Sequence, residues 1–227
     1  MPATFAAVQA VVFDAYGTLF DVHSAVARHR TRLGDQPDRV SALWRAKQME
    51  YSWLRSLMGR HADFWQVTQD ALDYALAASD IHDEALRREL LAAYQTLDAY
   101  PDAPAALARL KAAGLTTAIL SNGSPAMLHA AVASAGLAGR LDAVLSVEDV
   151  GVYKPDPRVY QLAVARLGVG PDAILFLSSN GWDVAGAACF GFRVAWVNRL
   201  GQPPERLPCG PDVELRSLAE LPALVGL

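Results

Sequence analysis

The sequence predicts an α/β fold in which a doubly wound, Rossmann-like parallel sheet carries a helical bundle inserted after its first strand. Residues 11–13 form a short apolar run that ends abruptly at Asp14, which is typical of a strand buried on both faces. Residues 21–97 show helical patterns and no convincing strand, whereas strand and helix patterns alternate after Pro101. Such alternation favours a parallel sheet with helices on both of its faces.

Three helical patterns make up the inserted segment. Apolar side chains recur at helical spacing from residue 40 to residue 58, and Asp38 can cap that helix. Residues 61–78 and 83–97 show the same period. The sequence therefore predicts two domains, a core of residues 1–18 and 99–227 and a helical cap of residues 19–98.

The second half of the chain alternates strands with helices. The predicted strands are residues 116–120, 143–147, 173–177 and 193–197. The predicted helices begin at Asp102, Ser124, Asp156 and about Trp182. Proline follows two of these starts and glycine follows three of the helix ends, as the geometry of helix termini favours. Residues 202–210, with three prolines, indicate a loop.

Composition limits the class of protein. The chain is 52% hydrophobic and 19% charged, which is enough apolar material for a core. A net charge of -4 gives no reason to expect nucleic acid or an anionic membrane as a partner. No signal peptide or membrane-spanning run is recognised. Cys189 and Cys209 have neither metal nor redox spacing, and two cysteines make no disulfide framework. We expect a soluble, reduced, cytoplasmic protein.

Polar side chains stand where several predicted strands end. In an open parallel sheet these ends meet at one edge, where ligands bind. An ammonium near a carboxylate favours its ionised, nucleophilic form, and hydroxyl and amide donors can hold an anion. Each residue alone fits a cap or a solvated charge, but together they predict a catalytic site. They are Asp14, Thr18, Ser121, Asn122, Lys154, Ser178, Ser179, Asn180 and Asp183.

This set of motifs resembles the haloacid dehalogenase superfamily over essentially the whole chain. Most members are magnesium-dependent phosphohydrolases with a second Asp two residues after the nucleophile, where this chain has Tyr16. They also carry a magnesium-binding acid where this chain has Ser178 and Ser179. A hard cation prefers several oxygen ligands, so the resemblance implies no metal here. A halide leaves as a stable anion and needs neither a metal nor a proton.

The closer resemblance is to the type II L-2-haloacid dehalogenases. It rests on residues 43–55, 121–123, 152–160 and 178–183. It implies an enzyme that converts L-2-haloalkanoic acids into D-2-hydroxy acids and halide, with inversion at C2 and an ester on Asp14. It also implies no cofactor and a homodimer, for which we expect a contact around Trp53 and Leu57.

The resemblance assigns roles to individual residues. Arg45 and Asn122 would receive the halide, while Ser121 and the backbone N–H groups beside Asp14, including that of Ala15, would hold the substrate carboxylate. An apolar wall around the alkyl group would consist of Tyr16, Met49, Phe64 and Trp182. The residues that position and activate water would be Lys154, Ser178, Asn180 and Asp183, supported by Thr18 and Tyr160.

Two alternatives stay open at this point. A magnesium-dependent phosphatase or phosphonatase shares the fold, but Tyr16 and the missing second acid near Ser178 disfavour it. A non-catalytic binding protein on the same fold would need no nucleophile. The residues that argue against it are Asp14, Thr18, Lys154 and Asp183.

Overall fold

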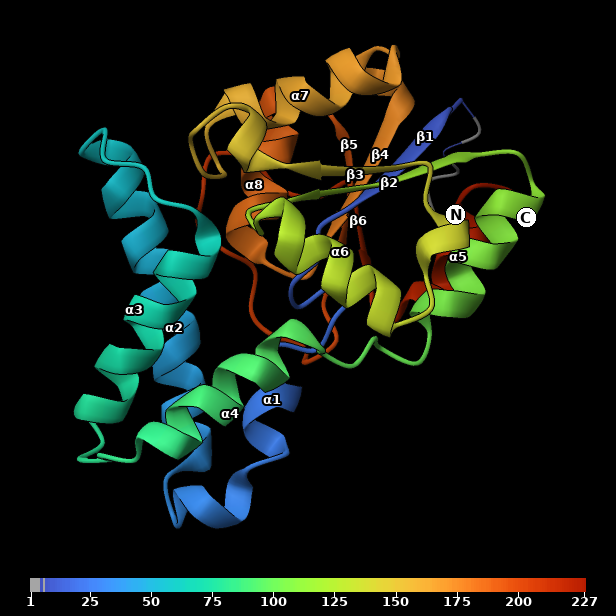
Figure 1. The fold of residues 1–227 in the computed structure, drawn as a ribbon. Helices are drawn as coiled ribbons and strands as arrows, with labels where there is room; N and C mark the ends of the chain where they lie inside the picture. The colour runs from blue at the N-terminus through green and yellow to red at the C-terminus, as the bar shows by residue number, and fades with distance from the viewer. Residues whose placement is uncertain (1–4, 6) are drawn as a thin grey trace.

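A six-stranded parallel sheet forms the centre of the molecule (Figure 1). The computed structural model describes residues 5 and 7–227. The spatial order is β3-β2-β1-β4-β5-β6. The strand bounds are Ala10–Phe13 for β1, Thr116–Ser121 for β2, Ala143–Ser146 for β3, Ile174–Ser178 for β4, Arg193–Val197 for β5 and Val213–Leu215 for β6. The predicted parallel α/β class is confirmed.

Strand β1 occupies the middle of the sheet because its side chains are apolar on both faces. All four of its residues are fully buried between β2 and β4. Strand β4 is buried over its whole length as well. A central strand with neighbours on both sides gives its carboxyl end a fixed backbone position. The residue that follows β1 is Asp14.

Helices cover both faces of the sheet, as the alternating pattern predicts. Figure 1 shows α7 and α8 on one side and α5 and α6 on the other. Their bounds are Ala103–Ala112 for α5, Pro125–Ser134 for α6, Pro157–Leu167 for α7, Gly181–Phe190 for α8 and Leu221–Leu224 for the short α9. Asp156 caps α7 by accepting a hydrogen bond from the Arg158 N–H at 2.9 Å. Gly168 ends that helix with φ 70°, where glycine avoids a steric penalty.

Over residues 21–97 the inserted segment forms helices joined by turns and contains no strand, as predicted. It contains α1 (Ser24–Ala27), α2 (Pro37–Leu57), α3 (Phe64–Ala77) and α4 (Glu84–Gln95). Asp63 and Asp83 cap α3 and α4 through their carboxylates. The prediction that Asp38 caps α2 is wrong: Pro37 takes the first helical position, so Asp38 lies in the first turn and binds Arg30. The division into a core and a cap domain stays a prediction.

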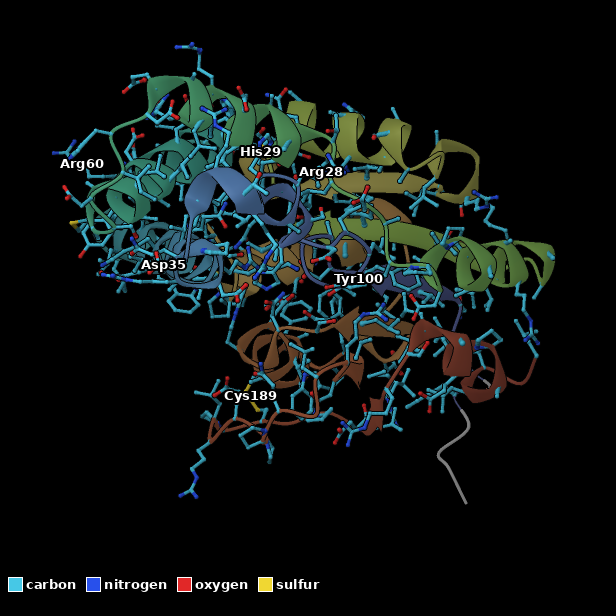
Figure 2. All side chains as sticks on the ribbon, turned by 90° about the horizontal axis from the view of Figure 1, so that it is seen from below. Arg28, His29, Asp35, Arg60, Tyr100 and Cys189 are labelled. Atoms are coloured by element: carbon cyan, nitrogen blue, oxygen red, sulfur yellow. A yellow bond between two sulfur atoms is a disulfide. The ribbon has the colours of Figure 1, made fainter. Side chains whose placement is uncertain are left out.

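The cysteines correct another expectation. Cys189, at the end of α8, and Cys209, in the loop before β6, form a disulfide with a Cα–Cα distance of 5.4 Å. Figure 2 shows the sulfur atoms beside the Cys189 label. The two cysteines stand 20 residues apart, and the loop that follows β5 brings them together: it packs Glu205 against Gly181 at the start of α8 before it reaches Cys209. The expectation of reduced cysteines is therefore wrong.

Among the residues that the structure describes, no helix combines the length and the apolar character needed to cross a membrane.

Candidate active site

The carboxyl ends of β1, β2 and β4 meet at one edge of the sheet, as predicted. The Asp14 N–H donates to the Leu177 carbonyl at 2.8 Å and so extends the pairing of β1 with β4 by one residue. Ser121 ends β2 on one side and Ser178 ends β4 on the other. Asp14 is 5% exposed. Its carboxylate is therefore buried on a rigid strand end.

Lys154 lies between two carboxylates. Its Nζ donates to Asp14 Oδ1 at 3.2 Å and to Asp183 Oδ2 at 2.8 Å. The hydroxyl of Tyr160 donates to the other Asp183 oxygen at 2.8 Å. Neither Lys154 nor Asp183 has exposed side-chain area. One ammonium thus links the two acids that the sequence places at separate strand ends.

Burial and charge shift the titration of this cluster. Burial lowers the pKa of the Lys154 ammonium, but Asp14 and Asp183 outweigh that effect and raise the pKa above its usual value. Burial raises the pKa of Asp183, the Asp14 charge adds to the rise, and Lys154 counteracts it only in part. Burial also raises the pKa of Tyr160 well above its usual value. Lys154 is therefore charged and Tyr160 neutral at physiological pH.

The second oxygen of Asp14 is held by neutral donors. Asn180 Nδ2 donates to Asp14 Oδ2 at 2.8 Å, and Thr18 Oγ1 donates to the same oxygen at 3.2 Å. Thr18 Oγ1 in turn accepts from the Ser179 N–H at 2.8 Å. Both carboxylate oxygens are thus fixed in direction, which suits a group that must attack along one line.

A small cavity lies beside Asp14. Its volume is about 10 Å³, and its lining contains Asp14, Tyr16, Arg45, Met49, Phe64, Ser121, Asn122, Asn180 and Trp182. Every predicted substrate-binding side chain except that of Ala15 is in this set. Within the described chain the Tyr16 hydroxyl and Arg45 Nη1 are buried without a hydrogen-bond partner. Buried polar atoms without partners are costly, so these two are available to a ligand.

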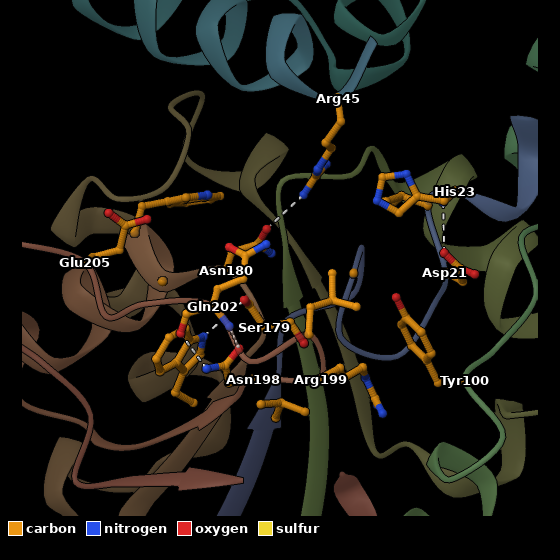
Figure 3. Close-up of a pocket in the computed structure, with 17 residues that line it drawn as sticks. Asp21, His23, Arg45, Tyr100, Ser179, Asn180, Asn198, Arg199, Gln202 and Glu205 are labelled. Carbon is orange, nitrogen blue, oxygen red and sulfur yellow. Dashed lines mark hydrogen bonds between the residues drawn. The ribbon is translucent and has the colours of Figure 1, made fainter. Parts of the chain in front are cut away.

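A larger outer pocket of about 410 Å³ adjoins the inner cavity. The two share Arg45, Asn180 and Trp182 in their linings. Figure 3 shows Arg45 extending from the inserted helices towards Asn180. Arg45 Nη2 donates to Asn180 Oδ1 and to the Tyr16 carbonyl, both at 3.3 Å. Arg45 therefore forms part of the partition between the two cavities.

Several predicted site residues also accept hydrogen bonds from backbone N–H groups. Ser178 Oγ accepts from the Asn180 N–H, and Ser121 Oγ accepts from the Gly123 N–H, both at 3.1 Å. Asn122 Oδ1 accepts from the Lys154 N–H at 3.0 Å. Ser178 is absent from the cavity lining. These contacts hold the turns that carry Asn180 and Lys154.

Ala15 contributes through its backbone. Among residues 5 and 7–227, the N–H groups of Ala15 and Tyr16 donate to no other residue. They follow the nucleophile directly and can bind an anion beside it. The predicted use of backbone N–H groups next to Asp14 is consistent with this geometry.

Sequence reasoning missed residues that act through close packing. A Cβ on Gly186 would lie 2.5 Å from the Tyr160 hydroxyl oxygen and 2.6 Å from Pro155 Cβ. A Cβ on Gly123 would lie 2.6 Å from the Tyr16 ring. Trp53 Nε1 donates to the Lys154 carbonyl at 3.2 Å, and its ring packs edge-on against Trp182. A glycine inside a predicted helix, such as Gly186, is the sequence signal for such a contact.

The donor atoms at this site do not fit a magnesium ion. Asp14 and Asp183 both accept from the Lys154 ammonium. The nearby Tyr16 carbonyl accepts from Arg45 and Asn180. A hard cation needs several oxygen ligands that are free of competing cations. The described residues contain no group of three or more His, Cys, Asp or Glu side chains that could hold a metal.

The site thus combines a buried Asp at the end of the central strand of a parallel sheet with one lysine that links it to a second buried Asp. Residues 8–191 match the family model described as haloacid dehalogenase-like hydrolase. The chain belongs to this family, and within it to the (S)-2-haloacid dehalogenases.

Two curated relatives and one solved structure support that assignment. The chain is 50% identical to (S)-2-haloacid dehalogenase 1 of Pseudomonas sp. strain CBS-3, covering 96% of each chain. It is also 50% identical to (S)-2-haloacid dehalogenase 4A of Burkholderia cepacia, covering 94% of this chain and 93% of that one. The L-2-haloacid dehalogenase of Xanthobacter autotrophicus with chloropropionic acid covalently bound superposes with a TM-score of 0.90. It is 45% identical over 96% of this chain and 98% of that chain.

Proposed function

We propose that this enzyme hydrolyses L-2-haloalkanoic acids to D-2-hydroxy acids and halide through an ester on Asp14. The observation that carries this proposal is the position of Asp14 at the wall of a small cavity lined by both polar and apolar side chains, with Lys154 on one oxygen and Asn180 and Thr18 on the other. A buried carboxylate with fixed oxygens suits in-line displacement. The covalent chloropropionate adduct of the Xanthobacter relative supports the same chemistry.

In the proposed first step, an Asp14 oxygen attacks C2 as the carbon–halogen bond breaks, and the halide leaves with the bonding electrons. Attack from the side opposite the halogen inverts C2. Arg45, with Nη1 free of a partner, and the Asn122 amide would receive the halide. Ser121 and the N–H groups of Ala15 and Tyr16 would hold the substrate carboxylate. Tyr16, Met49, Phe64 and Trp182 would exclude bulk water.

In the proposed second step, water adds to the Asp14 carbonyl carbon and the bond from that carbon to the ester oxygen breaks. Asp183 accepts one proton of the water. The departing alkoxide takes the other from the new Asp14 carboxyl group, which gives the hydroxy acid and restores the Asp14 carboxylate. Lys154 would stabilise the charge that develops on Asp14, because its Nζ lies 3.2 Å from Asp14 Oδ1. Asn180 and Ser178 would place the water, and Thr18 and Tyr160 would hold the network.

Chloride release from separate L- and D-2-chloropropionate samples, with EDTA present, tests this function. The proposal predicts release from the L enantiomer alone, and none from an Asp14→Asn variant. Release from the D enantiomer, or loss of activity in EDTA, would contradict it. No release from either, with turnover of phosphate esters in added magnesium, would favour the phosphatase alternative.

We further propose that the enzyme acts as a homodimer. Leu57 is 83% exposed and Met58 is 64% exposed at the end of α2, which supports a contact there. Trp53, the other residue expected at this contact, packs inward against Trp182 instead. Leu57 and Met58, together with Leu54 and Tyr74, are therefore the contact residues we propose.

A further inference from the structure

Arg199 follows β5 and lies at the floor of the outer pocket, outside the set of residues that surround the nucleophile (Figure 3). Its Nη1 and Nη2 donate to the two oxygens of Asp102 at 2.7 and 3.0 Å. Its Nη2 also donates to the Thr18 carbonyl at 3.1 Å. The guanidinium carbon lies 4.0 Å from the centre of the Tyr100 ring. Arg199 is thus bound on three sides.

The partners of Arg199 belong to the two segments that join the sheet to the inserted helices. Thr18 lies on the outgoing segment, and Tyr100 and Asp102 lie on the returning one. The two segments pair with each other, because the Asp21 N–H donates to the Asp98 carbonyl at 2.8 Å and the Tyr100 N–H donates to the Leu19 carbonyl at 2.9 Å. The Arg199 guanidinium therefore binds both segments next to the sheet.

The Asp102 carboxylate is used for its pair with Arg199 and does not cap its helix. It occupies the N-cap position of α5, yet its side chain makes no cap hydrogen bond. Its carboxylate instead accepts from Arg199, from Ser217 Oγ at 2.6 Å and from the Leu218 N–H at 2.8 Å. The C-terminal part of the chain thereby anchors the pair. Such multiple acceptance fixes the carboxylate and, through the bidentate pair, the plane of the guanidinium.

The Thr18 carbonyl connects the Arg199–Asp102 pair to the nucleophile. The same residue donates its hydroxyl to Asp14 Oδ2 and accepts from the Ser179 N–H. A shift of the Thr18 backbone would move that hydroxyl and with it the direction of the Asp14 carboxylate. We propose that Arg199 is a positioning residue for Asp14, acting through Thr18. This inference rests on the proposed role of Asp14 as the nucleophile.

Only arginine supplies this set of contacts. The planar fork binds both Asp102 oxygens, leaves an N–H for the Thr18 carbonyl and stacks on Tyr100. A lysine at this position keeps the charge but lacks the fork. Arg199→Lys is therefore expected to restore part of the function that Arg199→Met loses.

The test is the rate of chloride release in a single turnover, with enzyme in excess over L-2-chloropropionate, since this step forms the ester. We expect Arg199→Met to slow chloride release by about 10- to 100-fold, because the reacting groups are misplaced. The KM measured in the steady state should change by less than about threefold. The rate for Arg199→Lys should lie between the rates for Arg199→Met and the wild type. If Arg199→Met does not fold, Arg199→Lys and Asp102→Asn provide the same measurement.

A variant in the same strand serves as the matched control. Arg193, at the start of β5, pairs with Asp212 at 3.0 Å and lies over the Phe5 ring, so it makes the same kinds of contact far from Asp14. Arg193→Met should lower the melting temperature without changing the rate of ester formation. If Arg199 is purely structural, Arg199→Met should likewise lower the melting temperature and leave the rate of ester formation unchanged. That result would overturn the inference.

A double variant tests the route through Thr18. In a Thr18→Val background, Arg199→Met should slow ester formation much less than it does in the wild type, because the hydroxyl that it positions is gone. An equal slowing in both backgrounds would contradict the proposal. Wild-type enzyme that releases no chloride would instead overturn the proposed function, so the two failures are distinguishable.

Discussion

At the scale of single residues, the site depends on one buried ammonium shared by two buried carboxylates. Removing one partner of a buried pair is usually destabilising by about 3–5 kcal/mol, because the remaining charge is left uncompensated. When the charge of Asp183 is removed, Lys154 keeps its ion pair with Asp14. Residue 183 also keeps the Tyr160 hydroxyl as a hydrogen-bond donor. The effect of a change at Asp183 should therefore appear in catalysis more than in folding.

Asp183→Asn should give a folded enzyme that forms the Asp14 ester and hydrolyses it about 10²- to 10⁴-fold more slowly, because the acceptor for the water proton is lost. Intact-mass analysis after addition of L-2-chloropropionate should show the mass of the adduct. Thermal unfolding of the same sample serves as the control. An unmodified mass in a folded, inactive variant would count against the role of Asp183.

The pKa shifts predict the pH profile. The raised pKa of Lys154 means that its ammonium stays charged up to about pH 10.5 and loses its charge only as the pH rises through the shifted value. The raised pKa of Asp183 means that its ionised form is lost at a higher pH than for an ordinary aspartate. Ester hydrolysis should therefore fall on the acidic side and stay flat to about pH 10. An alkaline decline near pH 8 in single-turnover rates would contradict this account.

At the scale of elements, periodicity predicts the strands and the long helices well. Strand β5 matches its predicted bounds, and α3 and α4 begin at the Asp caps that precede their apolar stripes. Strand β6 was not predicted, since three residues after a proline-rich loop carry too little pattern. The cap prediction at Asp38 failed because Pro37 is compatible with the first helical turn.

The polar residues at strand ends could be predicted as a group because parallel strands share an edge, but their partners could not. The link from Asn122 to the Lys154 backbone and the contact of Gly186 with Tyr160 depend on side-chain directions across several elements. Sequence spacing does not encode such directions.

The packing of α8 against Tyr160 leads to a prediction for Gly186. Gly186→Ala should displace the Tyr160 hydroxyl or Pro155, because its Cβ would come within 2.6 Å of both. We expect turnover to fall by about tenfold and stability to fall by about 1–3 kcal/mol, the range for overpacking. Gly139→Ala is the control, since a Cβ there meets nothing within 4 Å. Equal behaviour of the two variants would rule out the packing argument.

At the scale of the whole molecule, the disulfide ties the end of α8 to the loop that carries Gln202 and Glu205 to the rim of the outer pocket. Reduction, or Cys189→Ser with Cys209→Ser, should lower stability by about 3 kcal/mol, as expected for a bridge that closes a loop of this length. Urea unfolding measures the change. Unfolding curves that coincide with and without reductant would show that the bridge contributes nothing.

The proposed dimer predicts a change in molecular mass. Leu57→Asp should place a charge in the contact at the end of α2 and yield monomers, because Leu57 is almost fully exposed in the single chain. Light scattering after size-exclusion chromatography gives the mass directly. A wild-type monomer, or a Leu57→Asp dimer, would contradict the proposed surface.

The ester on Asp14 is the central claim, and one isotope measurement tests it most directly. With enzyme in excess over L-2-chloropropionate in ¹⁸O-labelled water, water adds to the Asp14 carbonyl, so the label should enter the peptide containing Asp14. The hydroxy acid of that first turnover should be unlabelled, because its hydroxyl oxygen comes from Asp14. Label in the product, with none in the Asp14 peptide, would mean that water attacks C2 directly and that Asp14 is not the nucleophile.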